Sequence, residues 1–171
     1  MHICCGVCAA GAAEKLESEG HEIKGVFYNP NIHPAEEYTR RLKSSQAVAN
    51  AMDFVLIESK YNPVDWMNAT SSLKLEPEGG KRCEVCFRMR LRHTFDYMRE
   101  IGFDAFTTTL TIGPQKSPEA VNRIGKEIGG AQFLVRDFKK QGGFQRATEL
   151  AKKFQIYRQN YCGCIYSMRK P

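Results

Sequence analysis

Short apolar runs alternate with longer helical segments along most of this chain, and that alternation restricts the folds available to it. Residues 1–4, 23–28 and 54–57 are apolar and of strand length, whereas residues 9–19 and 35–52 between them have helical composition. Strands that alternate with helices in this way form βαβ units with parallel pairing and right-handed crossovers. The sequence therefore predicts an α/β fold, a three-layer sandwich with a mostly parallel sheet.

The second half of the chain continues the pattern. In an open parallel sheet, ligands bind beyond the carboxyl ends of the strands, where the loops converge. The cysteines that follow the first strand occupy the place of a phosphate loop or another active-site loop. The further elements expected are helices at residues 61–67, 83–100 and 118–128, and β-prone runs at 105–110 and 133–135.

We expect a single domain over residues 1–171, because the chain has the size of one domain and carries no repeat or obvious linker. No signal peptide precedes the first cysteines, and no apolar run approaches the roughly eighteen to twenty residues of a membrane span. The expectation is a cytoplasmic protein without a membrane partner. A net charge of +6 is compatible with a polyanion such as RNA, although many basic enzymes bind none.

Seven cysteines fall into three tight groups that are widely separated in the sequence. A secreted disulfide scaffold would have an even number, spread among the loops of a smaller domain. This distribution instead indicates a metal or thiol site. The groups are Cys4, Cys5 and Cys8; Cys83 and Cys86; and Cys162 and Cys164.

Cys83 and Cys86 form a CxxC motif at an expected helix start, where side chains three residues apart share a face and the helix dipole lowers the thiol pKa. Such a motif is typical both of half a zinc site and of a redox-active dithiol. Two adjacent cysteines such as Cys4 and Cys5 bind a single tetrahedral zinc ion only with strain, because the backbone between them is short. An iron–sulfur cubane offers each sulfur a separate iron, so a cluster is favoured over zinc. The alternative for Cys4, Cys5 and Cys8 is that they are small buried hydrophobic residues.

Cys162 and Cys164 are separated only by Gly163, which would let both sulfurs face one pocket and close a strained, easily reduced disulfide. Alternatively, one or both of these cysteines bind a metal, or both are inert. The neighbouring Tyr161 and Arg158, with Tyr157, Gln159 and Tyr166, either line a pocket for a planar base or pack as ordinary helix residues.

Two loops carry weaker candidates. Lys116, close to Thr108, Thr109 and Ser117, offers a cation and hydroxyls for phosphate at a strand-to-helix loop. Asp137 and Lys139 precede a glycine pair in a segment that either clamps an anion or turns the chain, and the turn is favoured. His33 and His93 are more typical of surface or capping histidines than of ligands.

Taken together, these motifs closely resemble the epoxyqueuosine reductases of the QueH type, in order across essentially the whole chain. One departure is that only Met1 precedes the histidine, so the first strand is short. The motifs are His2-Ile3-Cys4-Cys5-Gly6-Val7-Cys8, Arg82-Cys83-Glu84-Val85-Cys86-Phe87-Arg88, Asp104-Ala105-Phe106-Thr107-Thr108-Thr109-Leu110, Asp137-Phe138-Lys139-Lys140 and Tyr157-Arg158-Gln159-Asn160-Tyr161-Cys162-Gly163-Cys164.

The resemblance implies a cobalamin-independent oxidoreductase that reduces epoxyqueuosine to queuosine at the wobble position of tRNA, the last step in making that base. It implies a fold akin to the HUP domains, with the cysteine loop in place of the phosphate loop. Its partners would be tRNA and an unidentified electron donor. Tyr161 and Arg158 would then position the base by stacking and phosphate contact.

The resemblance also implies a [4Fe–4S] cluster and a redox-active thiol pair. It leaves Cys8 open, with an additional iron, shared with Cys164 or a carboxylate, as one expectation. The alternative function is a tRNA-binding or nucleotide-using module with structural zinc, but a nucleotide site needs a glycine-rich loop after the first strand and only Gly6 is present. The implied cluster ligands are Cys4, Cys5, Cys83 and Cys86, and the implied redox pair is Cys162 and Cys164.

Overall fold

The computed structural model describes residues 1–168. Its first half alternates helix and strand, in the order α1 (Gly6–Ser18), β1 (Lys24–Phe27), α2 (Ala35–Ala51) and β2 (Val55–Glu58). The second half is largely helical and contains the longest helix, α4. Its helices are α3 (Pro63–Thr70), α4 (Lys81–Glu100), α5 (Pro118–Gly129) and α6 (Gly143–Lys153), with 3-10 turns η1 (Ser71–Leu73), η2 (Thr109–Ile112), η3 (Gly130–Gln132) and η4 (Ile165–Ser167).

The two strands form a small parallel sheet in which Lys24 lies opposite Val55 and Phe27 opposite Glu58. Single parallel bridges extend this pairing to three further segments. His2 bridges both Val26 of β1 and Thr108, and Phe106 bridges Phe133. The protein is therefore an α/β protein with a parallel sheet. The spatial order is Phe133, residues 106–108, residues 1–3, β1 and β2.

The expected strands at 105–110 and 133–135 are thus wrong as continuous strands, and each is reduced to bridge residues. Residues 105–110 end early because the Thr108 side chain caps a turn: its Oγ1 accepts a hydrogen bond from the Leu110 backbone nitrogen at 3.1 Å. The chain then winds into η2. This is the local competition with sheet pairing that threonine side chains provide.

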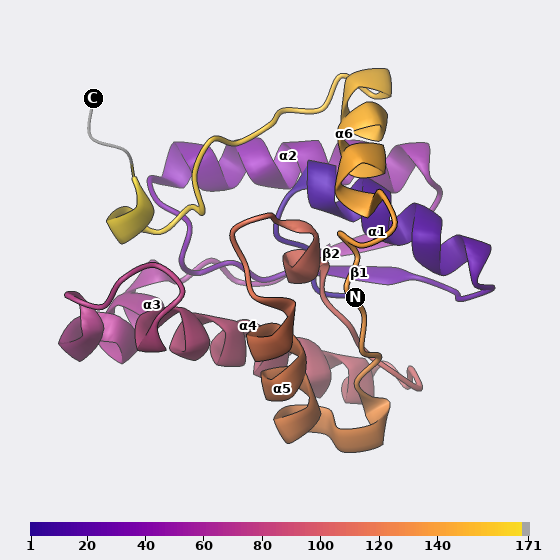
Figure 1. Ribbon diagram of the computed structural model, residues 1–171. Helices are drawn as coiled ribbons and strands as arrows, with labels where there is room; N and C mark the ends of the chain where they lie inside the picture. Colours follow the sequence, from indigo (N-terminus) through magenta and orange to yellow (C-terminus); the bar gives the residue numbers. More distant parts are fainter. Residues whose placement is uncertain (169–171) are drawn as a thin grey trace.

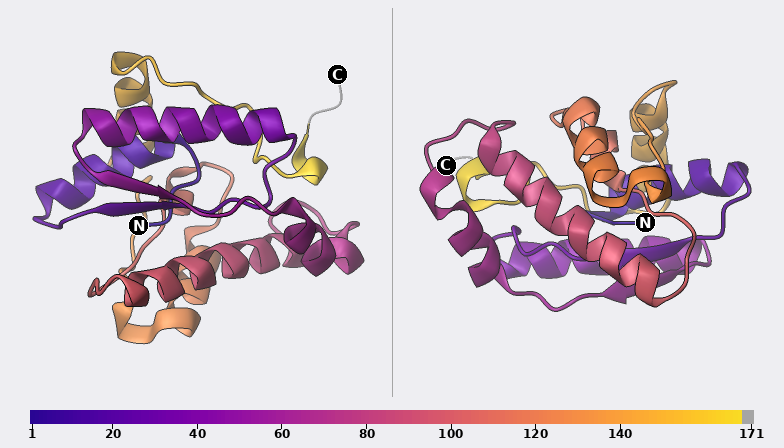
Figure 2. Two further views of the ribbon diagram at one scale, coloured as in Figure 1. Left: turned by 180° about the vertical axis from the view of Figure 1, so that it is seen from behind. Right: turned by 90° about the horizontal axis from the view of Figure 1, so that it is seen from below.

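Helices cover both faces of the sheet. Figures 1 and 2 show α1, α2 and α6 on one side of the strands and α3, α4 and α5 on the other. Helix α1 packs against both α2 and α6, and α4 packs against α3 and α5. None of the helices within residues 1–168 is both long and apolar enough to cross a membrane.

Helix α1 explains the run of alanines near the amino terminus. Ala9, Ala10, Ala12 and Ala13 are all fully buried, because their small side chains allow close packing of the first half of the helix. The helix begins at Gly6, three residues earlier than the sequence indicated, because the Ala9 nitrogen already donates to the Cys5 carbonyl at 3.0 Å. Cys8 consequently lies in the first helical turn rather than in a loop.

Residues 1–3 occupy the centre of the sheet. The Ile3 nitrogen donates to the Val26 carbonyl at 2.9 Å on one side, and the His2 nitrogen donates to the Thr107 carbonyl at 2.8 Å on the other. Residues 1–3 therefore pair with β1 on one side and with residues 106–108, much later in the chain, on the other. Such a switch in strand order opens a crevice beyond the carboxyl ends of the strands, and Cys4 stands at that point.

Candidate active site

Three thiols converge at the carboxyl end of the central segment. The Sγ atoms of Cys4, Cys5 and Cys8 all lie within 4.8 Å of one another, and those of Cys4 and Cys5 are 3.8 Å apart. Thr109 fixes this loop from the neighbouring segment: its Oγ1 accepts from the Cys4 nitrogen at 3.2 Å and donates to the Cys4 sulfur at 3.4 Å. The group could hold a metal ion.

The three thiols differ in acidity. Hydrogen bonds from the Cys5 and Cys8 thiols hold the pKa of Cys4 well below its usual range. The same contact with Cys4 raises the pKa of Cys5 to about 12, and it also raises that of Cys8. Cys4 is therefore the member of the group that favours the thiolate, the form that binds metals and attacks electrophiles.

The second pair stands at the start of α4, as the sequence predicts. The Cys83 sulfur accepts a hydrogen bond from the Gly79 nitrogen at 3.2 Å, and Cys86 is buried against Trp66. Burial raises the pKa of both thiols, that of Cys86 to about 11. The expectation that the helix dipole lowers these values is wrong, because desolvation of a buried thiolate outweighs the dipole.

The carboxyl-terminal cysteines separate at Gly163. This glycine has φ +116°, a left-handed conformation that other residues rarely adopt, and it turns the chain between the two thiols. The Cys162 sulfur accepts a hydrogen bond from Lys116 Nζ at 3.2 Å, whereas Cys164 is buried beside Cys86 and Trp66. Both are free thiols, and their side chains have different neighbours.

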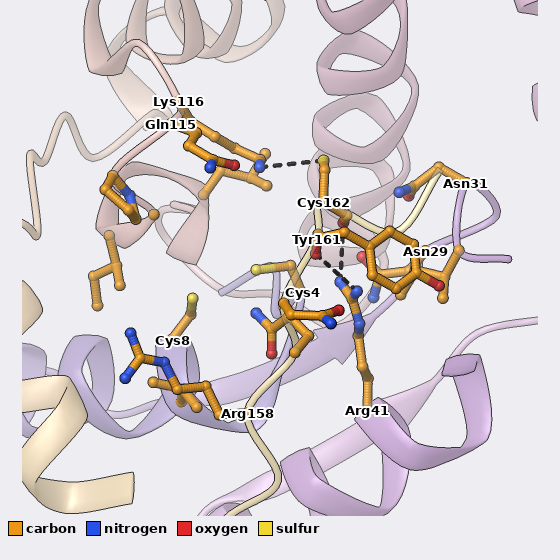
Figure 3. A pocket seen from close by; sticks show the side chains of 18 of the residues that line it. Cys4, Cys8, Asn29, Asn31, Arg41, Gln115, Lys116, Arg158, Tyr161 and Cys162 are labelled. Atoms are coloured by element: carbon orange, nitrogen blue, oxygen red, sulfur yellow. Dashed lines mark hydrogen bonds between the residues drawn. The ribbon is translucent and has the colours of Figure 1, made fainter. Parts of the chain in front are cut away.

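A cavity of about 420 Å³ opens above Cys4. Figure 3 shows thiols near its centre, amide side chains and Tyr161 on one side, and Lys116 and Gln115 opposite. Seven of the residues selected from the sequence line it, and they come from segments near both termini and in the middle of the chain. They are Cys4, Cys8, Lys116, Arg158, Gln159, Tyr161 and Cys162.

The remaining candidates lie outside this cavity. Cys5, Cys83, Cys86 and Cys164 are not among its lining residues. Asp137 lines a separate cavity beside α1 and α6, and its Oδ1 accepts from the Lys139 nitrogen at 3.3 Å. Lys139 Nζ donates to the Lys116 carbonyl at 2.9 Å, so this segment turns the chain and supports the Lys116 loop.

Arg41 is a residue at the cavity that the sequence did not indicate. It is 2% exposed, and its Nε donates to the equally buried Glu37 at 2.6 Å. Its two terminal nitrogens donate to the backbone carbonyls of Cys162 at 2.9 Å and Tyr161 at 3.0 Å. This pair, four residues apart on α2, resembles an ordinary surface ion pair in the sequence. In the fold it holds the carboxyl-terminal segment over the cavity.

Two further cations lie among the thiols, the buried Arg90 and the partly buried Lys116. Arg90 donates from Nε to the Cys86 carbonyl at 3.3 Å, and Lys116 contacts Cys162. Burial works against the charged form of both side chains, yet the nearby thiols of Cys86, Cys162 and Cys4 raise the pKa of Arg90 and of Lys116. The cavity floor thus combines soft sulfur ligands with fixed positive charge that compensates thiolates.

Comparison with known proteins gives the same family along the whole chain. A family model described as epoxyqueuosine reductase QueH matches residues 1–170. A protein of that name from Streptococcus pyogenes serotype M1 is 37% identical over 180 residues, covering 99% of this chain and 69% of the relative. The Haemophilus influenzae protein of that name is 34% identical over 173 residues, covering 99% and 71%. That from Thermotoga maritima is 35% identical over 176 residues, covering 98% and 88%.

Proposed function

Because the chain belongs to the epoxyqueuosine reductase QueH family, we propose that it reduces epoxyqueuosine to queuosine at the wobble position of tRNA. The reaction removes the epoxide oxygen with two electrons and two protons. One observation carries the proposal beyond family membership. Thiols from the amino-terminal and carboxyl-terminal groups line one cavity, together with an aromatic ring and several cations.

The Cys4, Cys5 and Cys8 thiols suit a metal site, and the resemblance of the family motifs implies an iron–sulfur cofactor in this region. Sulfur atoms of three cysteines approach within 4.8 Å of one another, and all seven cysteines are free. Cys4, Cys5, Cys83 and Cys86 would hold a [4Fe–4S] cluster, and Cys8 is the candidate ligand for an additional iron. When bound, such a cluster supplies electrons, and an iron with an open position polarises an oxygen atom.

The protein's own groups would move the protons. Lys116 Nζ lies in the cavity and is held in its charged form by the surrounding thiols, so it can donate a proton to the departing oxygen. Its contact with Cys162 at 3.2 Å connects that proton source to the thiol exposed in the cavity. Cys162 and Cys164 would be the redox-active pair, with Cys164 on the side of Cys86.

The base would stack on Tyr161, whose other ring face lies against the Arg41 guanidinium at 5.3 Å. Arg158 lines the same cavity and is exposed, which suits contact with an RNA phosphate. The partner is tRNA, in keeping with the net charge of +6. The electron donor would be a separate reductant.

We extend the proposal to the fold. The parallel order of residues 106–108, residues 1–3, β1 and β2, with helices on both faces, supports a HUP-like three-layer arrangement over one domain. In this arrangement, the segment from Cys4 to Cys8, which enters α1, takes the place of the phosphate loop.

The test is turnover of tRNA that contains epoxyqueuosine. Protein reconstituted anaerobically with iron and sulfide, and supplied with a reductant, is expected to produce queuosine, detected by nucleoside mass spectrometry. Unchanged epoxyqueuosine with a fully loaded protein refutes the proposal. Zinc in place of iron in the isolated protein would instead favour a structural metal site, since three neighbouring thiols also suit zinc.

A further inference from the structure

Asn31 lies in the loop that follows β1, at the carboxyl end of the sheet. It lines the cavity, and its side chain is buried, with 1% of the residue exposed. Neither Nδ2 nor Oδ1 has a hydrogen-bond partner among residues 1–168. A buried carboxamide without partners is costly, because two polar atoms lose water and gain nothing.

The backbone around Asn31 is fixed. Its carbonyl contacts the His33 ring at Nδ1, 3.1 Å away, and the next carbonyl, that of Ile32, accepts from the Tyr61 hydroxyl at 2.7 Å. The His33 nitrogen donates to the Gly163 carbonyl at 2.7 Å, which ties this loop to the carboxyl-terminal cysteine segment. The Asn31 backbone is therefore held in a set position at the cavity wall.

Asn29, two residues earlier, provides a direct comparison. It is also 1% exposed and lines the same cavity. Its Nδ2 donates to the Ile3 carbonyl at 2.8 Å, and its Oδ1 accepts from Arg90 Nη1 at 3.5 Å. The Asn29 side chain stabilises the fold next to Cys4, whereas the Asn31 side chain makes no hydrogen bond within residues 1–168.

We infer that Asn31 binds the polar edge of the base that enters the cavity, donating from Nδ2 and accepting at Oδ1. This inference rests on the proposed function. Figure 3 shows Asn31 and Tyr161 on the same side of the cavity, so a base that stacks on the tyrosine ring would lie beside the carboxamide.

The hydrogen-bonding groups of the base match those of the Asn31 carboxamide. A guanine-type base such as that of epoxyqueuosine has a lactam edge, in which a ring N–H lies beside a carbonyl oxygen. A carboxamide offers an acceptor and a donor side by side, so it satisfies both atoms at once. Asn31 then determines how the base is oriented, and thereby where the epoxide lies relative to the thiols.

The experiment compares two RNAs and several variants under anaerobic conditions without reductant. The RNAs are an anticodon stem-loop with epoxyqueuosine at the wobble position and the same stem-loop with an abasic wobble nucleotide. Dissociation constants are measured by fluorescence anisotropy for the reconstituted full chain. The variants are Asn31→Leu and Asn31→Ala, with Asn29→Leu as the buried comparison and Asn68→Ala on the exposed face of α3 as the surface control.

Both Asn31 variants are expected to bind the epoxyqueuosine stem-loop roughly 10-fold or more weakly, and the abasic stem-loop as tightly as the parent protein does. Their melting temperature stays at or above the parent value, while Asn29→Leu lowers it. Equal affinity of the parent and both Asn31 variants for the epoxyqueuosine RNA overturns the inference alone. A parent protein that does not distinguish the two RNAs overturns the inference and the proposed use of this cavity together.

Discussion

Arg41→Met is expected to destabilise the protein more than any substitution of an exposed arginine. The change leaves the buried Glu37 carboxylate without the partner 2.6 Å away, and it leaves the Tyr161 and Cys162 carbonyls without donors. Removing one member of a buried pair costs about 3–5 kcal/mol. Arg40, which stays 3.0 Å from the same carboxylate, and the Tyr157 hydroxyl, which donates to it at 2.7 Å, offset part of this, so we expect about 3 kcal/mol.

In a domain of this size, that loss corresponds to a decrease of roughly 10 °C in melting temperature. The assay is anaerobic thermal and denaturant unfolding followed by circular dichroism. Arg40→Met is the matched control, because Arg40 contacts the same carboxylate at 3.0 Å from a side chain that is 56% exposed. Glu37→Leu combined with Arg41→Met should recover much of the stability, since no buried charge is then left unpaired. If Arg41→Met and Arg40→Met have the same melting temperature, Arg41 does not hold the carboxyl-terminal segment as described.

Three further predictions address the cluster and the proton source. Cys83→Ala and Cys86→Ala should each abolish cluster assembly, seen as loss of iron and acid-labile sulfide; a full complement in either variant would contradict the ligand assignment. Gly6→Ala should cost about 1–3 kcal/mol and lower cluster yield, since its Cβ would lie 2.2 Å from Ser44 Oγ and 2.7 Å from the Ser44 carbonyl. Gly113→Ala is the control, because its Cβ would meet nothing closer than 3.7 Å. Equal free energies of unfolding for the two variants would refute the packing argument. Lys116→Met should lower kcat about 100-fold with little change in bound iron; an unchanged kcat would rule out Lys116 as the proton donor.

Local sequence signals predicted the elements that local interactions determine. Helix α2 begins at the expected residue and ends one residue early, because the break at Pro34 and the helical composition are both local. The CxxC at the start of α4 was also correct. Residues 105–110 were misjudged, since β-prone threonines were weighed by propensity while the Thr108 hydroxyl forms a cap.

The parts of the site that escaped prediction depend on contacts between distant segments. Arg41 is buried only because the carboxyl-terminal segment, about 120 residues away in the sequence, returns to α2. Cys162 and Cys164 have different surroundings because Gly163 turns the backbone and Cys164 packs beside Trp66. The spacing of the two cysteines in the sequence reveals neither feature. No signal in the sequence separates Asn31 from Asn29: both line the cavity, and only the side-chain hydrogen bonds of Asn29 in the folded protein distinguish the two.

The most direct test of the account measures iron, sulfide and single-turnover queuosine on one anaerobic preparation of the parent protein and of Cys162→Ser. The parent should carry a full cluster and form queuosine. The variant should retain most of its iron and sulfide and form none, because Cys162 is the thiol of the proposed redox pair that lines the cavity. A proportional fall of iron, sulfide and product in the variant, or no product from a fully loaded parent protein, would contradict the account.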